Sequence, residues 1–94
     1  MEIDQLRAQI DQLDTNITDL VCQRLNLCGQ IAAAKQREGK DVLVAEREKE
    51  ILARVCKQAG KEYETYVKKL YIAMFQLCRC HQTILISPGS GLKE

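Results

Sequence analysis

The fold of this chain is decided by residues 3–35, which read IDQLRAQIDQLDTNITDLVCQRLNLCGQIAAAK. Apolar side chains recur along this stretch in alternating steps of three and four, at Ile3, Leu6, Ile10, Leu13, Ile17, Leu20, Leu27, Ile31 and Ala34. Arg24 occupies the one position of this series that is not apolar. The spacing is the heptad period of an amphipathic helix, and no proline interrupts it. It predicts one helix over about residues 3–37, ended at Gly39.

The length of this helix predicts a partner. At ~1.5 Å per residue, a helix over residues 3–37 is roughly 50 Å long. A compact chain of 94 residues has a diameter of only roughly 30–35 Å. The face formed by the apolar side chains from Ile3 to Ala34 is called the seam below. It would lie uncovered unless a second copy of the chain packs against it. We expect an intertwined helical homodimer.

A second helix is predicted over about Ala45–Ala59, with Ile51, Leu52 and Val55 as its apolar stripe and Gly60 as its C-cap. A third is predicted from about Tyr63 to Leu85, and its inward side chains are expected to be Val67, Leu70, Tyr71, Met74, Leu77 and Ile84. The fold class is therefore all-α, with three helices and one very long N-terminal helix.

Two short apolar runs, Val42–Val44 and Thr83–Ile86, suit a strand as well as a helix. The sequence Ser-Pro-Gly-Ser-Gly at residues 87–91 ends the helical pattern. We expect residues 1–86 to form one helical domain and residues 87–94 to be a flexible tail or the start of a linker.

Composition excludes several classes of protein. Fourteen basic and thirteen acidic side chains leave a net charge of +1, so there is no basic field for nucleic acid. No apolar run approaches the ~20 residues of a membrane span. The chain opens on Met1-Glu2-Ile3-Asp4, which does not suit a secretory leader. We expect a cytoplasmic protein whose anionic ligands are bound by a local cluster of cations.

The cysteines are five in number and form no Cys-x-x-Cys pair: Cys22, Cys28, Cys56, Cys78 and Cys80. With a single histidine in the chain, they offer no standard metal spacing, so no metal site is expected. The prediction is reduced thiols that act as small apolar side chains.

Six polar residues are candidates for a binding site, although each has an ordinary structural explanation. Arg24 interrupts the seam, where it could also pair with a carboxylate of the partner chain to set the register. Lys35 lies within about 20° of the same helix face but could be a surface lysine. The Arg47-Glu48 pair at a helix start, Gln82 and Arg7 would each be unremarkable if exposed.

Together these residues indicate a cationic site between helices. No nucleophile–base pair, metal cluster or glycine-rich phosphate loop accompanies them. The residues alone therefore indicate a site that binds a small dianion between helices.

The order and spacing of the residues resemble the all-α chorismate mutase family over about residues 3–85. The matching residues are Leu6-Arg7, Ile10-Asp11, Leu13-Asp14, Arg24, Ile31, Lys35, Arg47-Glu48, Ile51-Leu52 and Gln82. The resemblance implies that chorismate, a dicarboxylate, is converted to prephenate by a [3,3] pericyclic rearrangement in phenylalanine and tyrosine biosynthesis. Such a step uses no cofactor, metal, acid, base or nucleophile. It needs a restrained substrate conformer and stabilisation of charge in the transition state.

The resemblance also implies a role for each residue. Arg24 would bind a substrate carboxylate, Lys35 and Gln82 would donate to the ether oxygen, and Glu48 would accept a hydrogen bond from the ring hydroxyl. Arg47 would line the pocket. Arg7 would bind the other carboxylate from the partner chain, since it lies seventeen residues, or about 25 Å of helix, from Arg24.

Two positions depart from the family pattern. Val44 stands where members often have an aspartate near the ring hydroxyl, and Cys78 replaces a serine that is a better hydrogen-bond donor. The nearest alternative is an isochorismate-pyruvate lyase of the same fold, which also lacks the aspartate but typically lacks the glutamate too. The presence of Glu48 favours the mutase. A non-catalytic regulatory helical module is a second alternative.

Overall fold

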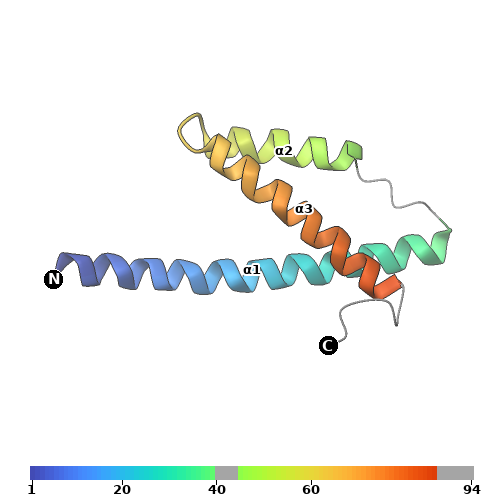
Figure 1. Cartoon of the computed structure of the whole chain (residues 1–94), viewed down its shortest axis with the longest axis horizontal. Coiled ribbons are helices and arrows are strands. Elements are labelled where there is room, and N and C mark those ends of the chain that lie inside the picture. The colour runs from blue at the N-terminus through green and yellow to red at the C-terminus, as the bar shows by residue number, and fades with distance from the viewer. Residues whose placement is uncertain (40–44, 87–94) are drawn as a thin grey trace.

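The computed structural model describes residues 1–39 and 45–86, which form three helices (Figure 1). These helices are α1 (Glu2–Glu38), α2 (Ala45–Ala59) and α3 (Glu64–Ile86). The predicted all-α fold with a very long N-terminal helix is confirmed. Thr83–Ile86 continues α3 as helix. Val42–Val44 and the predicted tail at 87–94 lie outside the described residues.

The ends of the helices follow from local chemistry. Acidic Glu2 and Asp4 lie in the first turn of α1 and basic Lys35 and Arg37 in its last turn, where each sign of charge is stabilised by the helix dipole. Gly39 ends α1 in the left-handed conformation, at φ 69° and ψ 22°, as the sequence predicted. Gly60 follows α2 with φ 84°, also as predicted.

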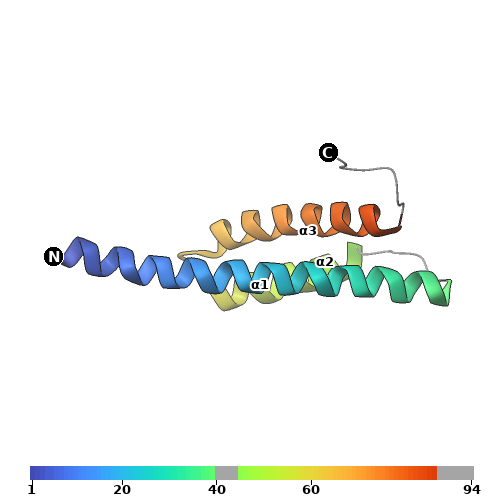
Figure 2. The same cartoon turned by 90° about the horizontal axis from the view of Figure 1, so that it is seen from below.

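The helices form two layers. α1 and α2 run in opposite directions in one layer, and α3 crosses both of them in a second layer (Figures 1 and 2). α3 packs against α1 and against α2, whereas the described parts of α1 and α2 make no close backbone approach to each other. The chain measures 55 × 34 × 18 Å with a radius of gyration of 16.6 Å, against about 12 Å for a compact chain of this length.

The core lies between α2 and α3. Ile51, Val55 and Phe75 are buried there, and Leu52, Val67 and Tyr71 pack around them. α1 joins α3 through small residues, since Cys28, Gly29 and Ala32 are its buried positions. The stripe predicted for α2 is therefore confirmed.

The face predicted to point inward on α3 is partly wrong. Leu70, Leu77 and Ile84 are 56%, 57% and 36% exposed, whereas Phe75 is only 5% exposed. α3 crosses the layer at an angle, and neither α1 nor α2 covers the side that carries these three residues. These exposed fractions refer to one chain without a partner.

The apolar seam of α1 is also uncovered. Its leucines and isoleucines from Ile3 to Ile31 are each 49–61% exposed. The N-terminal half of α1 projects away from the other two helices (Figure 1). An exposed apolar stripe of this length is typical of an interaction surface. No described helix is both long enough and apolar enough to span a membrane.

Candidate active site

A cavity of about 280 Å³ lies where the three helices meet. It lies beside α3, which packs against both α1 and α2, whereas the backbones of α1 and α2 make no close approach in the described part of the chain. The lining side chains are Arg24, Leu27, Cys28, Ile31 and Lys35 of α1, Arg47, Glu48, Ile51 and Arg54 of α2, and Phe75, Cys78, Arg79 and Gln82 of α3. The volume is close to the lower limit for small-molecule sites.

The charge of the cavity is strongly asymmetric. Five cationic side chains line it against the single carboxylate of Glu48, although the net charge of the whole chain is only +1. Leu27, Ile31, Ile51 and Phe75 add apolar surface to the wall, beside the two cysteines and Gln82, and lower the local dielectric constant. The cavity therefore suits a small anion with an apolar body.

The structure brings together most of the site residues predicted from the sequence. Those that line the cavity are Arg24, Lys35, Arg47, Glu48, Cys78 and Gln82. Arg7 does not line it, because it lies about 25 Å away along α1. Val44 lies outside the described residues.

Arg24 is held by aromatic rings. Its Cζ lies 5.7 Å from the ring centroid of Tyr71 and 5.8 Å from that of Phe75, both on α3. Its Nη1 lies 3.8 Å from Sγ of Cys28. None of the carboxylates in the described ranges pairs with it. Cation–π contacts orient this guanidinium and leave its hydrogen-bond donors available to an anion.

The other cations predicted from the sequence are weakly engaged. Lys35 is partly buried and pairs with no carboxylate among the described residues. Arg47 pairs with Glu50 at 3.2 Å, but both side chains are more than 60% exposed. An exposed pair of this kind contributes little free energy, so a ligand can compete for Arg47.

Glu48 on α2 forms an ion pair with Arg79 on α3, and both side chains line the cavity. Sequence reasoning did not single out Arg79 or Arg54 as lining residues. Arg79 precedes Gln82 by three residues on one helix, which is the spacing of neighbours on a helix face. This spacing could have predicted that Arg79 lies beside Gln82 in the site.

Gln82 is buried, with 6% of its surface exposed. Its Nε2 donates a hydrogen bond of 2.8 Å to the backbone carbonyl oxygen of Cys28 on α1. A primary amide has two N–H donors. One is used by Cys28, and Nε2 makes no other hydrogen bond to the described residues.

The prediction that all the cysteines are reduced thiols is wrong for one pair. Cys28 on α1 and Cys78 on α3 form a disulfide, with their Cα atoms 6.0 Å apart. The two residues meet because α3 crosses α1 at this point, a relationship that 50 residues of intervening sequence conceal. The proposed donor role of Cys78 is also contradicted, because a disulfide sulfur carries no hydrogen. Cys22, Cys56 and Cys80 are free.

Within residues 1–39 and 45–86, no group of three or more histidine, cysteine or acidic side chains is arranged to hold a metal ion. The described side chains also contain no buried nitrogen or oxygen atom that lacks a hydrogen-bond partner. The polar groups of the cavity are therefore either paired within the chain or accessible to solvent and ligand.

The chain is an all-α protein with one very long helix and a cationic cavity between its helices, an arrangement that suits a small anion. The comparisons with known proteins are more specific. Residues 6–83 match the family model described as chorismate mutase type II, and the chain belongs to that family. The family resemblance identified from the sequence is confirmed.

A similar curated protein is the "T-protein" of Enterobacter agglomerans, which is 40% identical over 58 residues. The match covers 62% of this chain but only 16% of the T-protein. The chain thus corresponds to a small part of that relative. No solved structure matches the chain.

Proposed function

We propose that this protein is a chorismate mutase, which converts chorismate to prephenate for phenylalanine and tyrosine biosynthesis. One observation carries the proposal: Arg24, Lys35, Glu48 and Gln82 of a chorismate mutase family chain line one cavity. In the rearrangement the ether C–O bond of the substrate breaks while a C–C bond forms within the same molecule. No atom enters or leaves, so restraint and electrostatics are sufficient.

Substrate binding is assigned to the cationic groups. Arg24, oriented by Tyr71 and Phe75, binds one carboxylate through its planar fork. Arg47 exchanges its exposed partner Glu50 for the substrate. The apolar wall holds the substrate in its folded, near-attack conformer. Because this conformational restriction is made on binding, it no longer contributes to the activation barrier.

Transition-state stabilisation is assigned to Lys35 and Gln82. Negative charge develops on the ether oxygen as its bond to carbon breaks. The ammonium of Lys35, which pairs with no carboxylate in the described ranges, and the second N–H of Gln82 donate to that oxygen. Because the bond from Gln82 to Cys28 already orients the amide, little reorganisation is needed during the reaction.

A second copy of the chain is proposed to complete the site. The exposed seam of α1 supplies the surface for a homodimer, and burying it removes apolar area from water at ~25 cal/mol per Å². Arg7 of the second copy would then bind the other carboxylate. Each dimer would carry two sites, and each site would use residues from both chains.

We also propose that the protein is cytoplasmic and binds neither nucleic acid nor membrane. Its balanced charge supports this assignment. Because cytoplasmic thiols are kept reduced, the Cys28–Cys78 disulfide would be open to reduction there.

The test is to incubate the purified chain with chorismate and, separately, with isochorismate, and to identify the products. Prephenate from chorismate is expected. Pyruvate and salicylate from isochorismate, without prephenate from chorismate, would establish the lyase instead. Turnover of neither substrate by the folded protein would support a non-catalytic module.

A further inference from the structure

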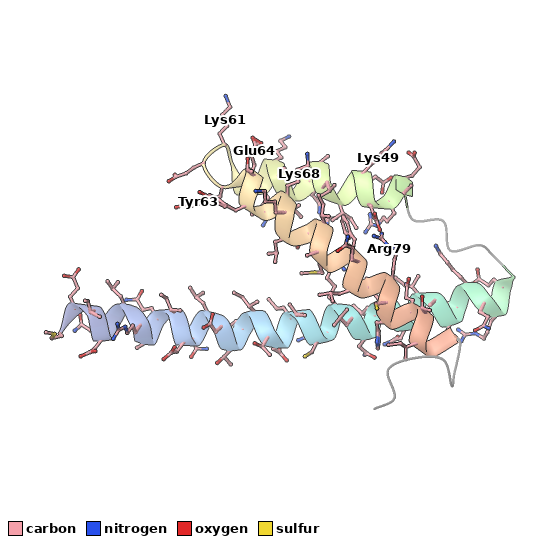
Figure 3. All side chains as sticks on the ribbon, in the orientation of Figure 1. Lys49, Lys61, Tyr63, Glu64, Lys68 and Arg79 are labelled. Carbon is pink, nitrogen blue, oxygen red and sulfur yellow. A yellow bond between two sulfur atoms is a disulfide. The ribbon has the colours of Figure 1, made fainter. Side chains whose placement is uncertain are left out.

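Arg79 and Glu48 are joined by an ion pair between Nη1 and Oε2. They come from different helices and are 31 residues apart in the sequence. Arg79 lies on the side of α3 that faces α2, whereas Lys49 points away from α3 (Figure 3). Both members of the pair line the cavity.

The carboxylate of this pair is more buried than the carboxylates of the other ion pairs in the described ranges, although Arg79 itself is 47% exposed. The side chain of Glu48 is 24% exposed, whereas Glu46 and Glu50, which pair with Lys49 and Arg47 on α2, are 88% and 67% exposed. A carboxylate that is three-quarters buried loses much of its hydration and is stabilised by a fixed cation. Arg79 is that cation.

The pair also determines which oxygen of Glu48 remains available. Oε2 is bound by Arg79, and no other hydrogen bond or ion pair within the described ranges engages the carboxylate. Other cations line the same cavity, so an untethered Glu48 could turn toward one of them. With Arg79 on Oε2, Oε1 is left as the acceptor for a ligand.

We infer that Arg79 is a positioning residue, which holds Glu48 so that Oε1 accepts the hydrogen bond of the substrate's ring hydroxyl. This inference rests on the proposed mutase function and adds a residue to it. Arg79 acts through Glu48 and does not contact the substrate. It therefore sets affinity for a substrate that carries the hydroxyl, and it leaves the chemistry at the ether oxygen to Lys35 and Gln82.

The experiment measures KM and kcat for chorismate in the whole 94-residue chain. The variants are Arg79→Met, Arg79→Lys, Glu48→Gln and the double variant Arg79→Met with Glu48→Gln. Arg79→Met is expected to raise KM about tenfold, with kcat changed by less than about threefold. Arg79→Lys, which keeps the charge, should raise KM by only about two- to threefold. The matched control is Lys49→Met, which removes an exposed ion pair of α2 outside the cavity and should leave both constants unchanged.

Two further readouts separate positioning from a purely structural role. In the Glu48→Gln background, Arg79→Met should change KM by less than about twofold, because the residue through which it acts is already altered. A chorismate analogue with hydrogen in place of the ring hydroxyl should be turned over equally well with or without Arg79. An equal loss for chorismate and for the analogue would mean that Arg79 only supports the fold, which overturns the inference.

The remaining outcomes are distinct. If wild-type protein does not turn over chorismate, the proposed function and this inference fall together. If wild type is active and Arg79→Met matches it, the inference alone falls. If Arg79→Met raises KM as much in the Glu48→Gln background as in wild type, Arg79 contacts the substrate directly and the inference is overturned. Should Arg79→Met fail to fold, Arg79→Lys provides the same comparisons on a smaller scale.

Discussion

Gln82 on α3 donates a hydrogen bond from Nε2 to the backbone carbonyl oxygen of Cys28 on α1, across 2.8 Å and 54 residues of sequence. The same Cys28 is linked to Cys78 by a disulfide. The crossing of α1 and α3 is thus held by two different bonds at one point. Gln82 is at once part of the helix packing and part of the cavity wall.

The first prediction concerns Gln82→Glu. A carboxyl group can donate a hydrogen bond only when it is protonated, and an ionised one would also face the carbonyl oxygen of Cys28. Turnover of chorismate should therefore be low at pH 7–8 and recover as the pH falls toward about 4, near the ordinary pKa of glutamate (~4.3). The measurement is kcat against pH, with wild type, which should be nearly flat over this range, as the control. Full activity of the variant at pH 7–8 would exclude Gln82 as the donor to the ether oxygen.

The second prediction concerns Lys35→Ala. If the ammonium acts mainly on charge that develops in the transition state, kcat should fall by about 10²–10³, or ~3–4 kcal/mol, with a much smaller change in KM. Arg37→Ala, which removes an exposed cation from the last turn of the same helix, is the matched control. A rise in KM at unchanged kcat would show that Lys35 only attracts the substrate.

The third prediction concerns the seam of α1. If the exposed leucines and isoleucines pack against a second copy, as proposed, sedimentation of wild type at micromolar concentration should give two chains. Ile17→Glu places a charge in the seam and should weaken dimerisation by at least about 10²-fold. Thr15→Glu lies off the seam and should leave the dimer intact. A well-folded wild-type monomer would contradict both the dimer and the shared site.

The fourth prediction concerns which of the two chains supplies Arg7 to each active site. Homodimers of Arg7→Ala and of Arg24→Ala should each be nearly inactive. In a mixed dimer both substitutions fall in one site and the other site is intact, so each mixed dimer should recover up to about half of the wild-type activity. Subunit exchange is verified separately by mass. Exchange without recovered activity would place Arg7 outside the active site.

The fifth prediction concerns the disulfide. Thiol titration of the oxidised protein should detect three cysteines, Cys22, Cys56 and Cys80, and reduction should raise the number to five. The bond closes a loop of about 50 residues, so reduction should lower the free energy of unfolding by up to about 4 kcal/mol. The difference in free energy of unfolding between the oxidised and the reduced protein should be unchanged in Cys80→Ser and absent in Cys28→Ser. Five reactive thiols in the oxidised protein would contradict the pairing.

The fold could be predicted well from the sequence because helix formation is largely local. The heptad spacing from Ile3 to Ile31 and the glycines at 39 and 60 gave helix bounds within one residue of those in the structure. The inward face of α3 was predicted less well. Phe75 and Leu77 are similar in hydropathy, so only the direction of the crossing decides which of them is buried.

The candidate site was predictable to the extent that its residues match a family pattern. Arg24, Lys35, Glu48 and Gln82 were all singled out, and all line one cavity. Arg79 was not, because a single arginine beside a cysteine on a helix resembles any exposed arginine. Its importance depends on Glu48, which is brought near it only by the packing of α2 against α3.

The sequence by itself determined the three helices, the uncovered seam of α1 and the family to which the chain belongs. These follow from short-range periodicity, from capping residues and from the spacing of charged side chains along a helix. Only the tertiary structure decided that Cys28 meets Cys78, that Gln82 is buried against a backbone carbonyl and that Arg79 binds Glu48. Each of these contacts joins residues 31 to 54 positions apart. They depend on the angle at which α3 crosses the other helices, and side-chain packing sets that angle only when the whole chain has folded.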